Sequence, residues 1–240
     1  LVRYYPRHYL NIDRFAFDSW LLSLVPPAVA VWQGNCRRIT RQGALFSLEL
    51  SLAGKTVFVQ AKRVVGADGA NSLARRTFFA DDIPRYVAIQ QWFRAIASGN
   101  PFYSCVFDAA ATPACAWAIH KDERFIFGGC YAAKDCRRAF EAEKQRLASQ
   151  QGFDFGECVK TEACLALSPR RPRHFQIGGG GVFLIGEAAG FISPSSFEGI
   201  SLAIQSGRHL AAAFLEQADT QAVHQAYRRR TAPLRGKLLL

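Results

Sequence analysis

The stretch GVFLIGEAAGFISPSSFEGISLAIQSGRHLAAAFLEQ, Gly181–Gln217, contains three successive local patterns. Val182–Ile185 is an apolar run followed by a glycine, which is typical of a short strand buried on both faces. The loop Gly186–Gly199 is rich in small residues, and from Gly199 onward the spacing predicts a helix. The stripe that we expect this helix to bury consists of Ile200, Ala203, Ile204, Gly207, Leu210, Ala211 and Phe214.

A strand, a glycine-rich loop and a helix without bulk in its first turn form a unit that suits a bound cofactor. Free N–H groups and the positive end of the helix dipole would face a ligand above Gly199 and Ile200. The carboxylate of Glu187 is placed to accept hydrogen bonds from sugar-like hydroxyls. A core strand–turn–helix unit with Glu187 as a solvated turn residue explains the pattern equally well, so this stretch alone leaves both interpretations open.

Two motifs far apart in the chain point to one family. They are VVGADGANSLARR, Val64–Arg76, and GEAAGFISPSSFEGI, Gly186–Ile200. Together they resemble the flavin-binding motifs of the FAD-dependent monooxygenase and geranylgeranyl reductase superfamily, whose later motif has the form G-D-A-A-G-F-x-x-P-x-x-G-E-G-I. The resemblance implies an FAD-binding domain over residues 1–80 and 176–240, and an inserted substrate-binding domain over residues 81–175. The expected fold class is α/β plus α+β: a partial, Rossmann-like FAD/NAD(P)-binding domain with a mostly antiparallel inserted sheet.

The resemblance also implies which residues contact the cofactor. Arg14 would lie near the FAD pyrophosphate, although a surface arginine at a helix start fits its position as well. Asp68 would lie near the pyrophosphate and ribityl chain, while an Asp-Gly turn whose carboxylate binds backbone amides is the common alternative. The full set of residues expected to contact FAD is Arg14, Asp68, Gly69, Gly186, Glu187, Ala188, Gly190, Pro194, Gly199 and Ile200.

The sequence departs from the family pattern at three points. The G-x-G-x-x-G unit that lets the backbone approach the pyrophosphate is absent. Glu187 replaces an aspartate but keeps its charge, so we expect its role to be kept. Phe197 replaces a glycine, where it would cover the flavin or narrow the substrate entrance, and we expect a negative φ there.

The remaining elements are predicted from periodicity and turn residues. A helix is expected over Ile12–Val25 with Asp13 as N-cap, followed by a short strand over Val29–Trp32. The next expected strands, separated by turns at Gly43 and Gly54, are Arg37–Thr40, Leu45–Leu50 and Thr56–Val65. Ser72 should cap a helix whose first turn contains Arg75. In the insert we expect five strands, Val87–Ala95, Tyr103–Asp108, Ala114–His120, Arg124–Tyr131 and Val159–Leu167, and one helix over Cys136–Gln150. Thr220–Leu240 is expected to form a basic, partly helical tail.

The aromatic residues of the insert would suit an apolar substrate, and they would equally suit an ordinary core. Among them Trp92 and Trp117, together with Phe197, are the expected substrate-lining residues. No serine–histidine–acid set, zinc spacing or P-loop is present, so the sequence identifies no catalytic residue and no metal ligand.

Composition limits the partners. The formal net charge of +11 favours anionic ligands, FAD among them, and peripheral contact with an anionic membrane surface is one option. Basic residues are spread along the chain, no nucleic-acid-binding motif accompanies Arg228–Arg230, and we expect no nucleic-acid partner. The seven cysteines contain no C-x-x-C pair, which favours reduced thiols in a cytoplasmic protein.

These observations support three functional hypotheses. The first is an FAD-dependent, geranylgeranyl reductase-like oxidoreductase that uses NAD(P)H and delivers hydride to a small apolar substrate, with isoprenoids among the candidates. The second is an FAD-dependent aromatic monooxygenase. The third, prompted by the absent glycine-rich unit and by a sequence without methionine, is a truncated or degenerate flavoprotein without activity of its own.

Overall fold

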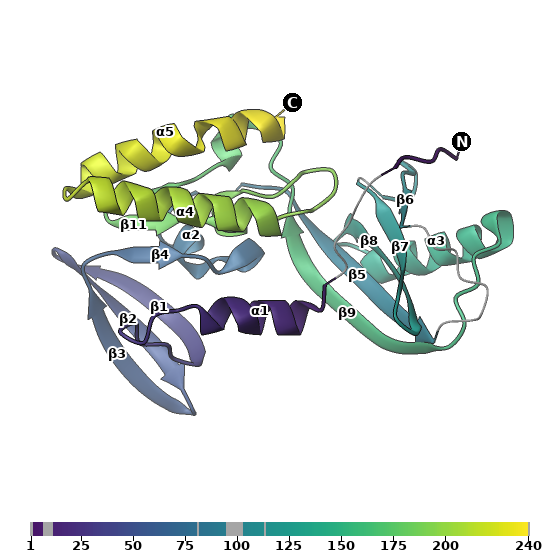
Figure 1. Ribbon diagram of the computed structural model, residues 1–240, viewed down its shortest axis with the longest axis horizontal. Helices are drawn as coiled ribbons and strands as arrows, with labels where there is room; N and C mark the ends of the chain where they lie inside the picture. Colours follow the sequence, from purple (N-terminus) through teal and green to yellow (C-terminus); the bar gives the residue numbers. More distant parts are fainter. Residues whose placement is uncertain (1, 7–11, 81, 95–102, 113, 240) are drawn as a thin grey trace.

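The computed structural model describes residues 2–6, 12–80, 82–94, 103–112 and 114–239. Two regions are visible in Figure 1. One is built on two small sheets, with α4 and α5 over the sheet that contains β4 and β11, and the other is built on a larger sheet with α3. This mixed helix-and-sheet architecture confirms the predicted fold class.

The first region is centred on a short sheet in which β11 lies in the middle. β4, Val64–Gly66, pairs in parallel with β11, Val182–Leu184, and β10, Gly178–Gly179, pairs with β11 in the antiparallel direction. The helices α4, Ile200–Glu216, and α5, Thr220–Leu239, run alongside each other next to this sheet (Figure 1). Fully buried Phe183, Ala213 and Tyr227 belong to the shared core.

A second sheet of the first region is the expected meander. Its strands are β1, Gly34–Gln42, β2, Leu45–Leu52, and β3, Lys55–Ala61, with positive φ at the turn glycines Gly43 and Gly54. The predicted strand Thr56–Val65 is wrong as a single element, because the chain leaves this sheet after Ala61 and enters the parallel sheet at Val64. The predicted strand Val29–Trp32 is also wrong, since these residues are irregular and pair with none of the described strands.

The second region is a five-stranded antiparallel sheet with the strand order β6-β7-β8-β5-β9. Its strands are β5, Arg85–Arg94, β6, Ser104–Val106, β7, Ala116–Lys121, β8, Arg124–Ala132, and β9, Cys158–Leu167. The helix α3, Cys136–Gln151, covers one face and packs Phe140 and Leu147 against Phe127. These elements confirm the expected strands and helix of the insert, except that Ala95 lies outside the described residues.

The helix α1, Arg14–Ser23, has the predicted N-cap, because the Asp13 carboxylate accepts a hydrogen bond from the Ala16 N–H at 2.8 Å. None of its residues is buried, and Phe15 is 84% exposed. The second edge of β4 has no strand partner among the described residues. The region of the parallel sheet therefore exposes the apolar side chains of α1 and leaves one edge of β4 without a strand partner among the described residues.

The buried face of α4 differs from the predicted stripe. The buried residues are Leu202, Ser206, Leu210 and Ala213. Ser206 is fully buried because its hydroxyl accepts a hydrogen bond from the Gly186 N–H at 2.8 Å and donates one to the Ala203 carbonyl. Ile200 and Ile204 are instead 38% and 43% exposed. A polar contact to the loop therefore sets the rotation of this helix, which hydrophobic periodicity does not show.

The helix α2, Leu73–Phe78, and three short 3-10 turns complete the structure: η1, Gly69–Asn71, η2, Pro172–His174, and η3, Gly186–Ala189. Within the described ranges no helix has the length and apolarity needed to cross a membrane.

Candidate functional site

The two sequence motifs meet at one edge of the small parallel sheet. β4 and β11 are parallel, so the turns that follow them, η1 and η3, lie at the same end of the sheet and pack together. A side chain on Gly69, which has a φ of +68°, would begin 3.9 Å from Glu187 Oε2. This end of parallel strands is where ligands bind in open α/β sheets. We call the residues of η1, η3 and the start of α4 together the cradle.

Glu187 is half-buried and uses one of its two oxygens within the protein. Oε1 accepts a hydrogen bond from the Leu167 N–H at 2.8 Å, which ties η3 to the end of β9. Burial raises the pKa of this carboxyl, and the Leu167 hydrogen bond acts in the opposite direction. Oε2 lies toward Gly69 and can accept a hydrogen bond from a ligand hydroxyl.

Asp68 is engaged in local hydrogen bonds. Its Oδ1 accepts from the Ser72 hydroxyl at 2.5 Å and its Oδ2 accepts from the Leu73 N–H at 2.7 Å. Ser72 caps α2 as predicted, because its Oγ accepts from the Arg75 N–H at 3.0 Å. The carboxylate of Asp68 therefore orders the turn before α2, as in the Asp-Gly alternative.

Arg75 is 1% exposed and supports the cradle from within the core. Its guanidinium donates to the Ala188 carbonyl and to the His174 carbonyl, each at 3.0 Å. The sequence places Arg75 in a first helical turn but gives no sign of this burial, since a buried guanidinium has no periodic signature.

The loop that leads into α4 contains a strained residue. Phe197 has a φ of +55°, so the expected negative φ is wrong. Its ring contacts the Tyr86 ring of β5 edge to face, with centroids 5.9 Å apart, and packs beside Ile83 and Leu167. These contacts across the two regions compensate for a left-handed backbone that costs a non-glycine residue about 1 kcal/mol or more.

The other loop residues named from the sequence have structural roles. Gly190 has a φ of +88°, and a side chain there would begin 2.8 Å from the His174 carbonyl oxygen, so only glycine fits. The Pro194 carbonyl accepts from the Ser168 hydroxyl at 3.2 Å.

The start of α4 offers donors to a ligand. Gly199 is its N-cap residue, and no described side chain caps the helix. The helix runs for 17 residues, and the N–H groups of its first turn have no intrahelical acceptors. The exposed Ile200 stands at this end. Backbone N–H groups and a positive helix terminus favour an anionic or electron-rich ligand.

The face of the five-stranded sheet opposite α3 carries a hydrogen-bonded aromatic network. The Trp117 indole donates to Gln90 Oε1 at 3.0 Å, and the Trp92 indole donates to Glu162 Oε2 at 2.9 Å. Trp117 lies flat over β8, because a side chain on Gly128 would begin 2.6 Å from its ring. Side chains alternate along strands, so Tyr86, which contacts Phe197, is on this same face.

The structure thus places Trp92 and Trp117 on one face of the sheet, and Phe197 contacts Tyr86 on the same face. Sequence reasoning missed Gln90 and Glu162, although both fall on the same strand alternation as the tryptophans of this face. Arg14 is placed differently: it lies on exposed α1 and pairs with Asp18 at 3.2 Å, and no contact within the described residues joins it to the cradle.

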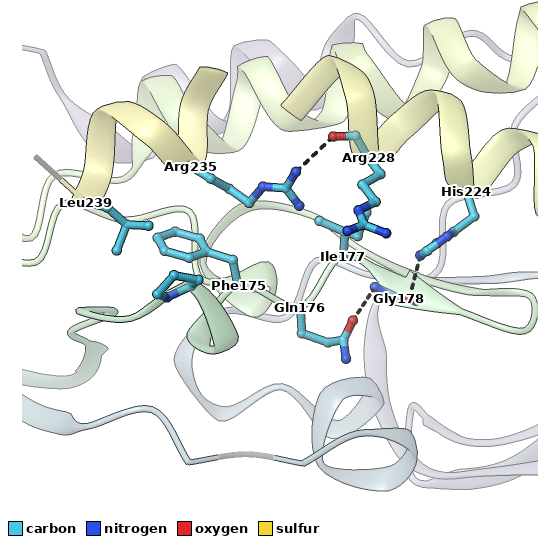
Figure 2. Close-up of a pocket in the computed structure, with 9 residues that line it drawn as sticks. Phe175, Gln176, Ile177, Gly178, His224, Arg228, Arg235 and Leu239 are labelled. Carbon is cyan, nitrogen blue, oxygen red and sulfur yellow. Dashed lines mark hydrogen bonds between the residues drawn. The ribbon is translucent and has the colours of Figure 1, made fainter. Parts of the chain in front are cut away.

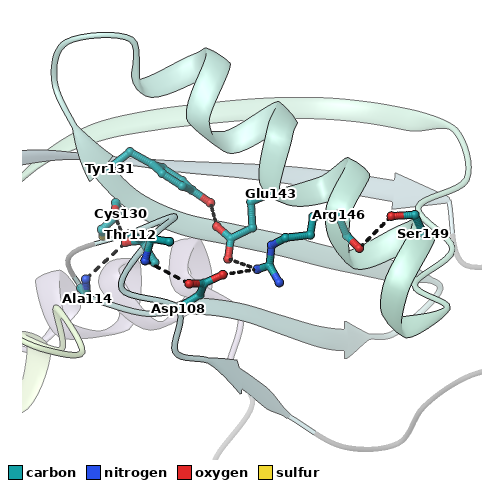
Figure 3. Close-up of polar contacts among 9 residues, drawn as sticks. Asp108, Thr112, Ala114, Cys130, Tyr131, Glu143, Arg146 and Ser149 are labelled. Atoms are coloured by element: carbon teal, nitrogen blue, oxygen red, sulfur yellow. Dashed lines mark hydrogen bonds and ion pairs between the residues drawn. The ribbon is translucent and has the colours of Figure 1, made fainter. Parts of the chain in front are cut away.

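A buried polar cluster lies on the α3 side of this sheet (Figure 3). Glu143 is 2% exposed, and its Oε2 accepts from the Tyr131 hydroxyl at 2.5 Å. Arg146 lies 3.7 Å from the other oxygen of Glu143 and 2.8 Å from Asp108. Burial raises the pKa of Glu143, with Tyr131 and Arg146 opposing this shift. The cluster links α3, β8 and the segment after β6, and none of its residues belongs to the cradle.

Comparison with known proteins identifies the family. A model described as "FAD binding domain" matches residues 46–239. The chain belongs to this FAD-binding domain family. Protein CbrA of Escherichia coli O6:H1 is 46% identical over 240 residues, covering 99% of this chain and 64% of that protein. Protein CbrA of Shigella dysenteriae serotype 1 is also 46% identical, covering 99% and 67%. The chain thus spans about two thirds of the length of these relatives.

Solved structures show the same fold. A geranylgeranyl bacteriochlorophyll reductase-like protein from Thermoplasma acidophilum superposes with a TM-score of 0.76 at 19% identity, covering 94% of this chain and 59% of that one. A variant of HpxO from Klebsiella pneumoniae, solved with FAD, gives 0.63 at 16% identity, covering 95% and 62%. The flavin-dependent halogenase CmlS gives 0.65 at 20% identity, covering 85% and 40%.

The donor set of the cradle fits the flavin and ribityl part of FAD. Gly199 and Ile200 supply uncapped backbone amides, and Glu187 Oε2 supplies an acceptor beside the side-chain-free Gly69. Amides suit the electron-rich edge of a flavin, and a carboxylate oxygen suits a ribityl hydroxyl. No pyrophosphate-binding glycine unit occurs in this sequence.

Proposed function

We propose that this chain is the flavin- and substrate-binding part of an FAD-dependent oxidoreductase acting on a small apolar substrate. One observation carries this proposal: the cradle loop lies against the aromatic face of the five-stranded sheet, through the contacts Phe197–Tyr86 and Glu187–Leu167. Trp92 is six residues from Tyr86 along β5, or roughly 20 Å. A substrate on this face would therefore meet the start of α4 at Tyr86 and Phe197 and extend past Trp117 toward Trp92.

The roles of the residues follow from their chemistry. FAD, when bound, supplies the electron pair. The amides of Gly199 and Ile200 would stabilise negative charge on the flavin, and Glu187 would orient the ribityl chain. Phe197 and the two tryptophans would exclude water and hold an apolar body, since their rings present apolar surface around few polar atoms.

A reductase that delivers hydride from flavin, itself reduced by NAD(P)H, is the reaction that we favour. The likeness to the geranylgeranyl bacteriochlorophyll reductase-like protein supports this choice, and it makes an isoprenoid a reasonable substrate class. The second candidate is aromatic hydroxylation. It is supported by the flat Trp117 surface over Gly128, which suits a planar ring, and by likeness to aromatic hydroxylases such as CabE.

The first experiment measures flavin retention by visible absorption after FAD addition and desalting. Wild-type protein should keep a perturbed flavin spectrum, and Glu187→Gln should weaken FAD binding about tenfold, because a charged hydrogen-bond acceptor is lost. Glu198→Gln is the matched control, since Glu198 lies in the same loop, is exposed and accepts only from Ser201 Oγ among the described side chains. Equal FAD affinity in both variants would remove Glu187 from the site.

A second experiment separates the two reactions. The flavin-loaded protein is reduced anaerobically with NADPH and then given a prenyl compound or a phenol. Flavin reoxidation by the prenyl compound without oxygen supports the reductase, whereas product formation from the phenol only with oxygen supports the hydroxylase. Failure of wild-type protein to retain FAD would limit the oxidoreductase proposal to a longer chain.

A further inference from the structure

A pocket of about 430 Å³ lies between α5 and the segment that runs from η2 into β10 (Figure 2). None of the residues assigned to the cradle or to the aromatic face lines it. Its volume is within the range of roughly 300–1,000 Å³ that is common for small-molecule sites.

One wall of the pocket is cationic. Arg228 and Arg235 are seven residues apart on α5, so both project from the same side of the helix, and Figure 2 shows both guanidinium groups at the pocket. The Arg235 guanidinium donates to the Arg228 carbonyl at 3.1 Å. Within the described part of the chain no carboxylate forms an ion pair with either arginine.

The charge of Arg228 acts on Arg235. Burial lowers the pKa of Arg235, and the positive charge of Arg228 lowers it further. Arg228 is exposed and Arg235 is partly buried. An anion placed between them would offset their repulsion and the partial loss of hydration of Arg235.

The opposite wall is apolar. It is formed by Pro172, Phe175 and Ile177, and Leu239 closes one end. Phe175 and Ile177 are only 8% and 4% exposed, so they are fixed in the core and present a rigid surface.

The other polar groups of the pocket already have partners inside the protein. His224 Nε2 lies 2.7 Å from the Gly178 carbonyl oxygen, and Gln176 Oε1 accepts from the Gly178 N–H at 3.0 Å. His224 and Gln176 therefore hold the wall in place. The Gln176 amide nitrogen lies on the side away from the two arginines in Figure 2, so the guanidinium groups are the charged donors that face a ligand.

We propose that this pocket binds a ligand with a carboxylate or phosphate group on an apolar body, the anionic group between Arg228 and Arg235 and the apolar part against Phe175 and Ile177. Guanidinium suits these anions because its planar fork of N–H donors matches their oxygen atoms. The site is separate from the proposed flavin reaction and does not depend on it.

Octyl phosphate and inorganic phosphate are the probes, and binding to the purified protein is measured by calorimetry. We expect octyl phosphate to bind more tightly than inorganic phosphate, because only the former can cover the apolar wall. Arg228→Gln and Arg235→Gln should each weaken octyl phosphate binding about tenfold. Arg229→Gln is the matched control, because Arg229 is an exposed neighbour on α5 that does not line the pocket. Flavin retention should be unchanged in all three variants, which separates this test from that of the flavin site.

Absence of octyl phosphate binding to the wild-type protein would overturn the proposal. An equal loss in Arg228→Gln and Arg229→Gln would also overturn it, because binding would then reflect the general positive charge of the chain. Vesicles of phosphatidylglycerol distinguish the two sources of the anion: capture by vesicles that depends on Arg228 supports a lipid headgroup, and octyl phosphate binding without vesicle capture supports a soluble ligand.

Discussion

The two regions of the molecule bury ionisable side chains in opposite ways. In the region of the parallel sheet, the Arg75 guanidinium donates to backbone carbonyls of His174 and Ala188, which are 99 and 113 residues away in sequence. In the five-stranded region, the Glu143 carboxyl accepts from Tyr131, which is 12 residues away. The first arrangement joins distant segments, and the second reinforces neighbours that already pack together.

The two regions also differ in what stabilises them: long strand pairing and an aromatic core in one, and side-chain hydrogen bonds in the other. The five-stranded sheet has long antiparallel pairs and an aromatic core of its own under α3. The parallel sheet has strands of only two or three residues. Tyr227 donates to its strand residue Leu184, and Arg75 and Ser206 hold the turns beside it. The candidate cofactor site therefore lies in the region that depends more on single polar contacts.

Replacement of Arg75 by methionine should give the largest effect. Two buried carbonyls lose a charged donor, so the free energy of unfolding should fall by about 3 kcal/mol. Urea denaturation measures this loss, and hydrogen exchange should become faster around residues 174–191 and unchanged in β5 and β8. Arg76→Met is the control, because Arg76 is exposed and its guanidinium donates locally, to the Ser72 carbonyl at the start of its own helix. Similar losses in the two variants would contradict the role given to Arg75.

The second-largest effect that we expect is on the pH dependence of the free energy of unfolding, to which Glu143 contributes. Its pKa is raised in the folded protein, so its favourable contribution is complete below the ordinary value of about 4.5 and is lost as the pH rises through the raised pKa. Stability of the five-stranded region should fall over this window in wild-type protein and fall less in Glu143→Gln, which stays neutral. Urea midpoints across the acidic to neutral range test this, with Glu141→Gln on the same helix as control. If the urea midpoint changes with pH equally in the wild-type protein and in Glu143→Gln, Glu143 is not the group responsible.

The junction between the regions should show the smallest effect. Phe197→Gly and Phe197→Ala both remove the ring that contacts Tyr86, but only glycine adopts the φ of +55° without strain. Phe197→Gly should therefore be more stable than Phe197→Ala by about 1 kcal/mol. Chemical denaturation of the pair gives this difference directly, and a more stable alanine variant would show that the backbone changes its conformation.

The sequence predicted most of the fold because the strongest signals are local. Alternating strands and the helix Cys136–Gln151 follow from periodicity, and the turns follow from Gly43 and Gly54. It failed where a tertiary contact overrides a local pattern. Lys62 and Arg63 divide an apparently continuous strand between two sheets, and Ser206 rotates α4 toward Gly186.

The sequence motifs predicted which loops form the candidate site, but not the contacts that their side chains make. The motifs placed Ser72 as a cap, which the structure confirms. They also named Gly69 and Glu187 as FAD contacts; the structure places these two residues side by side, and their contact with FAD stays a prediction. They could not show that Asp68 uses both oxygens to order the start of α2, nor that Phe197 has a positive φ. The pocket at Arg228 and Arg235 had no sequence signal except a seven-residue spacing of basic residues on one helix.

The register of β5 against β9 has a consequence for chain entropy. Arg85 at the start of β5 pairs with Leu167 at the end of β9, so the chain enters and leaves the five-stranded sheet at adjacent points. β4 and β11, which must pair across this insertion, are then connected by a short effective loop once the sheet has formed. Closing a shorter loop costs less conformational entropy and is faster. We therefore expect that a folded five-stranded sheet lowers the entropic cost of pairing β4 with β11, the strands that precede the two motifs.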